Sequence, residues 1–498
     1  LYRSLENSEI RHITSRHEQG AGFMADGYAR VTGKPGVCFV ITGPGMTNIA
    51  TAMGQAYGDS IPLLVISSTN VHGYQGLGEG HLHELHSQSA LISGVSAFSQ
   101  TVLDPVKLPG VLARAFSIFE GKRPRPVHIE IPIDAFKLNA SVIKGVSPLA
   151  VCRPAPNPQA IKQAAHLLSN AKSPLVLLGG GAVDAADEVR KIIELLDAPT
   201  GLTINAKGLL PPDHPLLCGS YISCVPMQDY ISKADVILAI GTEMGETDYD
   251  LINKTGLLIN GKLIRVDIEA DQITRNYQPD IAITSDASLA LRALIDNLGS
   301  LERASSIDGS LRTLDIRLKC EASTAVWIEA HKPWFDVIDQ VYEDPIIVGD
   351  STQPIYSANQ FYNANSPRSY FNSATGYGTL GYALPASIGA KLAEPQRNVI
   401  CFIGDGGILF TIGELASAIE AKVGIIILLW NNKGYQTIKE YMLEFQVPPI
   451  GCIEFTPDFQ TIASGFGCKT AHVNSPEALR SELKKLNKLK KPALIEIT

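Results

Sequence analysis

The sequence predicts an α/β protein of three doubly wound domains, each with a parallel sheet covered by helices on both faces. Its 498 residues exceed what one ordinary core accommodates, and an apolar content of 45% is enough to bury two or three cores. Short apolar runs rich in β-branched residues alternate with segments of helical period, which is the pattern of parallel sheets. Three units of comparable size give domains at 1–147, 148–320 and 321–498.

Ten apolar runs are predicted to be the strands of these sheets, and they fall into three groups along the chain. In order, they are 37–42, 63–67 and 127–131; 175–178, 236–240 and 263–267; and 346–349, 399–403, 425–430 and 493–497. The proline-bearing segment 148–158 is predicted to be a linker. The more charged stretch 301–323 has no strong strand pattern and is predicted to be the next connector.

The charge and composition favour small-molecule ligands. A net charge of −8 and a pI near 5.8 give no extended basic surface, which argues against a nucleic-acid or anionic-membrane partner. Apolar stretches such as 423–430 are far shorter than the roughly 20 residues that cross a bilayer. The eight cysteines include no CxxC pair and resemble reduced core residues. With no visible secretory signal, we expect a cytoplasmic protein, and we do not expect Leu1 to be the natural start.

Two loops in the last third combine the residues of a metal site. The strand at 399–403 runs directly into Gly404-Asp405-Gly406-Gly407, a turn that offers backbone N–H groups to an anion and a carboxylate at the carboxyl end of the strand. The next helix is predicted to begin at Thr411, because Thr411 and Glu414 match a capping box. The strand at 425–430 then ends in Asn431-Asn432-Lys433-Gly434. Neighbouring parallel strands would bring the two loops together.

This pairing predicts a magnesium–diphosphate site. The Asp405 carboxylate, the Asn432 amide oxygen and the Gly434 carbonyl are hard oxygen ligands with too little charge to hold a bare divalent ion. Mg²⁺ binds in such places by sharing its octahedron with phosphate oxygens and water. Alone, a Gly-Asp-Gly turn or an Asn-Asn loop is common. Asn432 follows Asp405 by 27 positions, however, and this is the spacing of the thiamine-diphosphate motif.

Along nearly all of its length the chain resembles the superfamily of acetolactate synthases, pyruvate decarboxylases and benzoylformate decarboxylases, in its acetolactate-synthase-like branch. The resemblance is carried by segments 16–30, 42–48 and 376–385, together with the two loops above. It implies a pyrimidine-binding domain at 1–147, a central domain at 148–320 and a diphosphate-binding and metal-binding domain at 321–498. Members of the family carry another strand and helix before the position of Leu1, so we expect the first domain to be truncated at its N-terminus.

The same resemblance implies the roles of residues around thiamine diphosphate. Glu18 would hydrogen-bond the aminopyrimidine ring and favour the imino tautomer, whose nitrogen deprotonates the thiazolium carbon. The alternative is a glutamate that merely begins a helix, where negative charge is favourable. Leu380 would be the wedge beneath the thiamine, and the Gly378 carbonyl would accept a hydrogen bond from the exocyclic amine. The other implied cofactor-binding residues are Gly43, Gln353, Gly404, Asp405, Gly406, Gly407, Asn432, Gly434 and Tyr435.

A histidine stands where acetolactate synthases carry a glutamine that faces the cofactor. It is His83, in Leu82-His83-Glu84. A histidine near neutrality can protonate an enamine, which favours release of an aldehyde over ligation. The surrounding cluster of His72, His81, His83 and His86 has two other interpretations, a polar loop or a metal site.

Substrate contacts are expected on the segment 435–445, which the family keeps mobile. Tyr441 stands where acetolactate synthases have a tryptophan, and Glu440 and Glu444 lie one helical turn apart. A carboxylate in the pocket would favour a cationic group, as in a guanidino or amino 2-oxo acid. The alternative, that both are exposed helix charges, stays open. Segments 349–354, 82–84 and 438–441 resemble those of bacterial 5-guanidino-2-oxopentanoate decarboxylases.

The preferred hypothesis is therefore a thiamine-diphosphate-dependent and Mg²⁺-dependent lyase that decarboxylates a 2-oxo acid through a carbanion-enamine, with 5-guanidino-2-oxopentanoate as the candidate substrate. The alternatives are an acetolactate-synthase-like carboligase, which is a transferase, and a non-catalytic cofactor-binding homologue. A nicotinamide enzyme would rest on Gly179-Gly180-Gly181, but the dinucleotide motif needs a glycine where Asp184 stands. FAD is not expected, because segment 241–249 replaces the flavin segment. The family implies a homodimer at minimum, and we expect a homotetramer.

Overall fold

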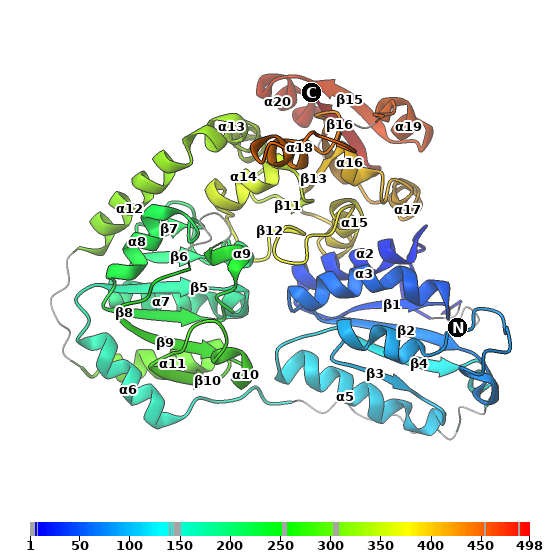
Figure 1. Cartoon of the computed structure of the whole chain (residues 1–498), viewed down its shortest axis with the longest axis horizontal. Coiled ribbons are helices and arrows are strands. Elements are labelled where there is room, and N and C mark those ends of the chain that lie inside the picture. Colours follow the sequence, from blue (N-terminus) through cyan, green and yellow to red (C-terminus); the bar gives the residue numbers. More distant parts are fainter. Residues whose placement is uncertain are drawn as a thin grey trace.

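A computed structural model describes residues 5–6, 8–138, 141, 143, 151–250, 256–301, 308–452, 455–486 and 489–498. Three parallel sheets flanked by helices form three units, with the last unit lying across the other two (Figure 1). The predicted fold class is confirmed. Among the described residues, no helix is both long enough and apolar enough to cross a membrane.

The sheets contain all ten predicted strands. The first sheet has the order β1 (Gly36–Val40), β2 (Leu63–Thr69), β4 (Val127–Pro132) and β3 (Phe98–Thr101). The second has the order β10 (Ile281–Thr284), β9 (Lys262–Asp267), β8 (Val236–Ile240), β5 (Pro174–Leu178), β6 (Thr200–Leu202) and β7 (Leu217–Gly219). The third has the order β12 (Tyr370–Asn372), β11 (Ile346–Gly349), β13 (Val399–Gly404), β14 (Ile426–Trp430), β16 (Ala493–Ile497) and β15 (Lys469–Val473).

The helices that cover these sheets begin where local sequence favours it. Asn157 caps α6 with its side chain and Pro158 occupies the first position, and Ser475 and Pro476 do the same for α20. The α-helices are α2 (Glu18–Thr32), α3 (Pro44–Gly58), α4 (Gln88–Ile92), α5 (Leu108–Gly121), α6 (Pro158–Ser169), α7 (Ala186–Leu196), α8 (Val225–Lys233), α9 (Glu246–Tyr249), α10 (Ala270–Ile273), α11 (Ala287–Leu298), α12 (Gly309–Ser323), α13 (Ala325–Val341), α14 (Gln353–Phe361), α15 (Ala383–Ala393), α16 (Asp405–Ile408), α17 (Glu414–Glu420), α18 (Gln436–Glu444), α19 (Phe459–Gly465) and α20 (Pro476–Lys485).

The two predicted connectors differ in structure. Residues 151–157 form neither helix nor strand, whereas 148–150 lie outside the described residues. The stretch 301–323 is mostly helix, because Asp308 caps α12 and residues 309–323 continue it; residues 302–307 lie outside the described part. Helix α12 packs on α8 and β7 of the central unit, and α13 packs on α14 and α20 of the last unit. The predicted boundary between 320 and 321 therefore falls inside a helix.

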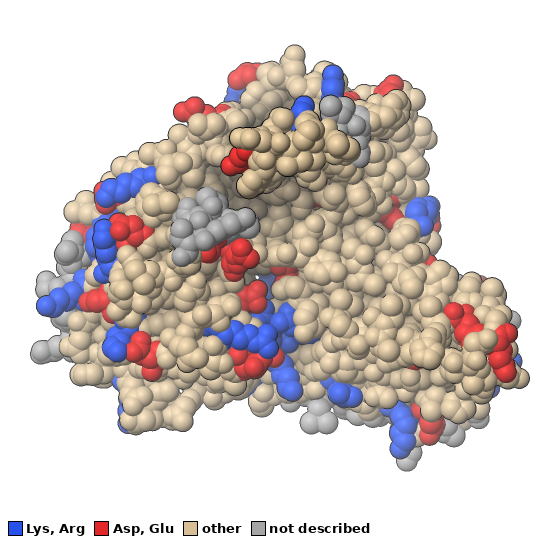
Figure 2. Space-filling model, viewed as in Figure 1, with Lys and Arg blue, Asp and Glu red and all other residues tan. Residues whose placement is uncertain are grey.

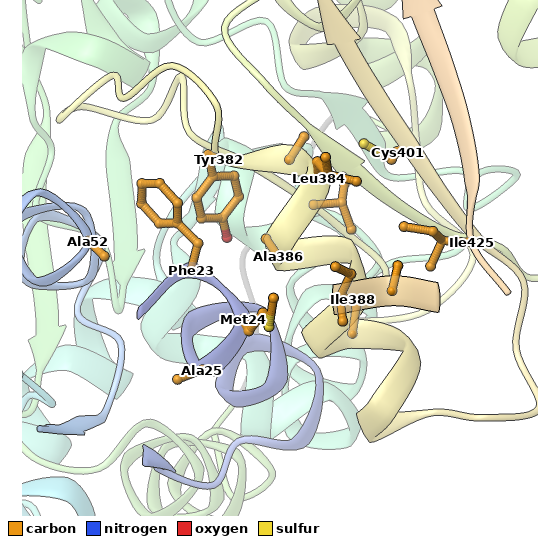
Figure 3. Packing of buried hydrophobic residues seen from close by; sticks show 14 of the residues in the cluster. Phe23, Met24, Ala25, Ala52, Tyr382, Leu384, Ala386, Ile388, Cys401 and Ile425 are labelled. Atoms are coloured by element: carbon orange, nitrogen blue, oxygen red, sulfur yellow. The ribbon is translucent and has the colours of Figure 1, made fainter. Parts of the chain in front are cut away.

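The first and last units share one apolar core, built where α2 meets α15. Phe23 and Met24 of α2 point towards Tyr382 and the buried face of α15 (Figure 3), and the Phe23 and Tyr382 rings meet edge to face with centroids 5.2 Å apart. A Cβ at Gly27 would lie 2.1 Å from the Ala386 carbonyl, so the two backbones touch. This close approach fixes the first unit against the last unit of the same chain.

A buried charged network lies where all three units meet. Arg30 of α2 binds Asp26 at 2.6 Å and Asp59 at 2.5 Å, and its guanidinium also donates to Asn205 of the central unit at 3.3 Å. Asp59 accepts a further hydrogen bond from Thr375 of the last unit at 2.8 Å. A paired and hydrogen-bonded charge of this kind is tolerated in a core, and it ties the three units together.

A cavity of about 470 Å³ opens beside this network. Its walls include Gly179, Gly180 and Gly181 after β5, but a Cβ at Gly179 would lie 2.2 Å from the Gly241 carbonyl, so close backbone packing alone accounts for that glycine. Three arginines that line the cavity are already paired with carboxylates; the pairs are Arg123–Glu243, Arg153–Asp286 and Arg368–Asp184. On the face of the molecule in Figure 2, acidic and basic side chains are likewise interspersed, without an extended basic area.

Candidate functional site

The predicted metal loops lie side by side at the carboxyl edge of the third sheet. Strands β13 and β14 pair in parallel with Gly404 opposite Trp430, so Asp405 and Asn431 leave the sheet together. The Asp405 carboxylate is buried and accepts a hydrogen bond from the Gly434 N–H at 2.8 Å. Burial raises the pKa of Asp405, and the backbone donors around it oppose that rise. The loops that carry Asp405, Asn432 and Gly434 therefore lie side by side, and their binding of a metal stays a prediction.

Asn432 carries a polar atom that has no partner within the described protein. Its side-chain Nδ2 donates to Gln353 Oε1 at 3.1 Å, whereas its Oδ1 is buried without a hydrogen bond. An orphaned carbonyl oxygen in a buried position costs free energy unless another group satisfies it. On the loop whose Gly434 N–H contacts the Asp405 carboxylate, this oxygen fits a hard divalent cation such as Mg²⁺.

The glycines of the turn after β13 lie close to neighbouring side chains. A Cβ at Gly406 would lie 2.5 Å from the Tyr435 ring, and one at Gly407 would lie 3.2 Å from Asp350 Oδ1. At Gly404 the Thr352 hydroxyl is 3.2 Å away. The glycines therefore let neighbouring groups approach the turn closely, which suits a cradle for a diphosphate. The fit of these residues to a metal-bound diphosphate is good.

Two expectations for this region need correction or qualification. Helix α16 begins at Asp405 itself, and α17 begins at Glu414 without a side-chain cap, so the capping box at Thr411 is wrong. Both side chains are taken by other segments: the Thr411 hydroxyl donates to the Gly381 carbonyl at 2.7 Å, and the Glu414 carboxylate accepts the Arg16 and His17 N–H groups at 3.0 Å. The Gly434 carbonyl already accepts from Gln436 N–H at 2.9 Å, although a second lone pair remains.

The substrate segment meets the metal loops through Gln353. The Gln353 amide donates to the Glu440 carboxylate at 3.2 and 3.3 Å, and Gln436 donates to the same group at 2.9 Å. Glu440, Tyr441 and Glu444 are all exposed on helix α18, and among the described residues no hydrogen bond links Tyr441 or Glu444 to the metal loops. The structure therefore distinguishes Glu440 from Glu444, which the sequence treats alike.

A second cluster forms around Glu18 at the start of α2. Its carboxylate accepts from Asn48 Nδ2 at 2.9 Å, and a Cβ at Gly45 would lie 3.6 Å from Glu18 Oε1. The backbone of His83 covers Gly43, where a Cβ would lie 2.6 Å from the His83 carbonyl. Gly43 and His83 both have positive φ values of 69° and 59°. The first domain thus gathers Glu18, Gly43 and His83 at one edge of its sheet.

The hydrogen bonds of the described residues do not join this cluster to Asp405 or Asn432 within one chain. His72, His81, His83 and His86 lie in the loop between β2 and α4, and His81 stacks on Tyr74 with centroids 4.5 Å apart. No group of three or more His, Cys, Asp and Glu side chains in the described part is arranged to hold a metal. The metal-site interpretation of these histidines is therefore unsupported.

The segment expected to contact thiamine has the backbone that its glycines require. Gly378 has a φ of 77° and donates its N–H to the Ser373 carbonyl at 3.1 Å. Leu380 beside it is half-buried, and Thr379 between them is held by two hydrogen bonds to Gln55 of α3. The roles of the Gly378 carbonyl and Leu380 stay predictions.

Three residues of the site were missed in the sequence. Asn48 orients Glu18, and Glu414, only 1% exposed, ties the start of α2 to α17. Asp350, fully buried, accepts the Ser351 and Ala383 N–H groups at 2.9 and 3.1 Å, and burial raises its pKa to about 7. Asp350 and Asn48 stand inside the motifs quoted above, which is the signal that would have found them.

Comparison with known proteins identifies the family. Residues 1–91 match the description "Thiamine pyrophosphate enzyme, N-terminal TPP binding domain", residues 161–294 match its central domain and residues 350–497 match its C-terminal TPP binding domain. The chain belongs to the thiamine pyrophosphate enzymes. The two loops that carry Asp405 and Asn432 lie inside the C-terminal match, and Glu18 lies inside the N-terminal match.

Relatives of this thiamine pyrophosphate enzyme include both a decarboxylase and synthases. It is 43% identical over 489 residues to the protein named probable 2-ketoarginine decarboxylase AruI of Pseudomonas aeruginosa, covering 97% of this chain and 86% of the relative. It is 34% identical over 508 residues to acetolactate synthase isozyme 1 large subunit of Escherichia coli, covering 100% of this chain and 88% of the relative. Identity is 30% to the protein named probable acetolactate synthase large subunit of Methanocaldococcus jannaschii, covering 100% and 87%.

Proposed function

We propose that this enzyme decarboxylates a 2-oxo acid with a cationic end, with 5-guanidino-2-oxopentanoate as its substrate, in a reaction that depends on thiamine diphosphate and Mg²⁺. Thiamine diphosphate supplies the electron sink for the carbon that loses carbon dioxide. The observation that carries the proposal is the Glu440 carboxylate, which lies two hydrogen bonds from Asn432 and has no ion-pair partner among the described residues. The 43% identity to a 2-ketoarginine decarboxylase supports it.

The residues of this chain divide the work between the two clusters. Asp405 and Asn432 would hold the metal, and Glu18, which accepts a hydrogen bond from Asn48, would hold and move a proton at the aminopyrimidine ring. Glu440 binds the guanidinium by a charge-assisted hydrogen bond, which discriminates against uncharged 2-oxo acids. His83, held beside Gly43, donates the proton that releases an aldehyde.

The deciding experiment offers the enzyme pyruvate and 5-guanidino-2-oxopentanoate in separate reactions and identifies the products by mass. We expect carbon dioxide and 4-guanidinobutanal from the guanidino acid. A matched pair of variants locates the recognition: Glu440→Gln should lower kcat/KM for this acid about 10- to 100-fold, the value of a hydrogen bond to a charged group, and Glu444→Gln should change it little. Equal effects of the two variants would contradict the role of Glu440.

The second candidate is an acetolactate-synthase-like carboligase, favoured by the 34% identity to the Escherichia coli synthase. Formation of acetolactate from pyruvate as the main product would replace the first proposal with this one. For either reaction we propose a homodimer or homotetramer. We also propose that the enzyme binds no FAD, since the arginines named at the central cavity are already paired with carboxylates. A flavin absorption band in the purified protein would contradict the FAD prediction. The cytoplasm stays the predicted compartment.

A further inference from the structure

Three segments that are far apart in the sequence meet through one glutamine side chain. Gln353 is the first residue of α14, Asn432 follows β14, and Glu440 lies in the middle of α18. Asn432 Nδ2 donates to Gln353 Oε1 at 3.1 Å, and Gln353 Nε2 donates to Glu440 Oε2 at 3.2 Å. The three side chains form a continuous row of hydrogen bonds from the metal loop to the substrate segment.

The orientation of Asn432 at the predicted metal site determines which atoms donate and which accept along this row. An amide presents its oxygen on one side and its two donors on the other. When the buried Asn432 Oδ1 faces a cation, Nδ2 must face Gln353, and Gln353 can then present only its oxygen to Asn432. The Gln353 NH₂ group consequently points towards Glu440, where a carboxylate is the matching acceptor.

Among the described residues, helix α18 has few other side-chain contacts, one of them between Cys452 Sγ and Met442 Sδ at 3.3 Å. None of its residues is buried, and Ile438, Tyr441 and Leu443 are exposed by 52%, 58% and 54%. An element with so few buried apolar contacts has a low local stability, so a small number of hydrogen bonds decides its position. Gln436 also donates to Glu440, but it belongs to α18 itself and cannot anchor that helix to the rest of the protein.

We infer that Gln353 is a positioning residue that couples occupation of the metal site to the placement of Glu440. A cation on Asn432 Oδ1 orients Asn432, Asn432 orients Gln353, and Gln353 holds α18 with the Glu440 carboxylate in place for the cationic end of the substrate. This inference rests on the proposed function for the identity of the substrate group, whereas the coupling itself concerns only the hydrogen bonds described here.

The coupling is tested by hydrogen–deuterium exchange of peptides covering 436–444 in the full chain. Thiamine diphosphate with MgCl₂ should slow exchange in the unaltered protein relative to protein without either. Gln353→Glu keeps the acceptor for Asn432 and loses the donor to Glu440, so the slowing should disappear. Gln436→Met is the matched control, because it removes an amide from Glu440 without touching Asn432, and the slowing should persist.

Cofactor occupancy is measured in the same samples, which separates failed loading from failed coupling. Glu440→Leu removes the acceptor at the other end of the row, which has no direct hydrogen bond to Asn432, and must also abolish the slowing. If thiamine diphosphate and MgCl₂ still slow exchange in peptides 436–444 of Glu440→Leu, the inference is overturned. This holds even if the Gln353→Glu variant fails to bind the cofactor and metal.

A second readout is selectivity. The ratio of kcat/KM for 5-guanidino-2-oxopentanoate to that for 2-oxohexanoate should fall about 10- to 100-fold in Gln353→Met, mainly through KM, since a charged hydrogen bond loses its orientation. An unchanged ratio overturns the inference for the substrate. If the unaltered enzyme does not turn over the guanidino acid, the proposed function fails, while the exchange experiment still decides whether Gln353 couples metal and helix.

Discussion

Two neighbouring asparagines at the end of β14 differ in the partners that their side-chain amides have. Asn431 donates to Glu496 at 2.7 Å and accepts the Lys433 N–H at 3.2 Å, so both ends of its amide are satisfied. Asn432 leaves its oxygen unsatisfied. Asn431 therefore shapes the loop, whereas the free acceptor of Asn432 is the atom that we propose as the cation ligand.

Alanine substitutions should separate these jobs. Asn432→Ala should abolish Mg²⁺-dependent binding of thiamine diphosphate, because it removes a metal ligand together with the orphaned oxygen. Asn431→Ala should preserve that binding and lower the free energy of unfolding by about 1–3 kcal/mol, the cost of leaving Glu496 and Lys433 N–H without their partner. Titration calorimetry with MgCl₂ and with a chelator measures the first effect, and urea unfolding the second. Equal loss of binding in both variants would contradict the assignment.

His128 gives the first domain a pH dependence. Its ring is fully buried between Ser67 and Ser99, with Oγ–N distances of 2.9 and 2.7 Å, and burial lowers its pKa from 6.5 to about 4. The unfolded chain binds the proton more readily than the folded chain does. The contribution of His128 to the free energy of unfolding is therefore complete above about pH 6.5. It falls by about 3 kcal/mol as the pH drops to 4.

His128→Gln keeps a donor and an acceptor for the two serines but cannot titrate. Its urea midpoint should decline less steeply than that of the unaltered protein between pH 6.5 and 4. His166→Gln, on the exposed side of α6, is the control and should follow the unaltered protein. Parallel pH profiles for His128→Gln and the unaltered protein would show that another group sets the acid sensitivity.

At the scale of elements, the sequence predicted what is local or periodic. Every predicted strand is present, because short runs dominated by apolar residues mark buried strands even where a polar residue interrupts them, as in β4 and β9. Three strands have too weak an apolar pattern to be predicted from the sequence. Strands β6 and β12 have only three residues each, and β15 contains exposed residues. The metal loops were predictable because β13 and β14 are consecutive strands that are also neighbours in the sheet.

Contacts between distant segments were not predictable in the same way. Thr411 and Glu414 match a local capping pattern, but a carbonyl 30 residues away and two N–H groups about 400 residues away compete successfully for them. Asn48 and Gln353 likewise gain their roles from partners on other elements. A pattern confined to one segment does not contain that information, and only tertiary packing supplies it.

The ion pair between Arg30 and Asp59 holds helices α2 and α3 together. Breaking it is expected to cause the largest loss of stability among the variants proposed here. Asp59→Ala should lower the free energy of unfolding by roughly 3–5 kcal/mol, since it leaves the Arg30 guanidinium short of a partner in a buried position. Asp229→Ala breaks the exposed pair with Lys233 on α8 and should cost less than about 1 kcal/mol. Urea unfolding of both variants tests the difference. Similar losses would indicate that the Arg30 pair is hydrated.

At the scale of the whole molecule, Glu18 and Asp405 belong to two clusters that no hydrogen bond of the described residues joins within one chain. An assembly that pairs the first cluster of one chain with the second cluster of its partner predicts complementation. Glu18→Gln and Asp405→Ala should each be inactive, and Glu18→Gln should still bind thiamine diphosphate with Mg²⁺. Dissociating and reassembling an equal mixture should restore about a quarter of the unaltered activity, because half of the dimers then contain one intact site.

Two controls accompany this experiment. Each inactive variant is dissociated and reassembled alone and should stay inactive, and sedimentation should show assemblies of at least two chains. A mixture that remains inactive although mixed assemblies are present would mean that both clusters of a site come from one chain.

The network around Arg30 also limits how this protein can be divided. Its charges lie in the first unit, while Asn205 of the central unit and Thr375 of the last unit complete their hydrogen bonding. A fragment cut at either connector would expose those groups to water, together with the apolar seam between α2 and α15. The three units look like separate modules, but we expect them to fold only together, as parts of one chain.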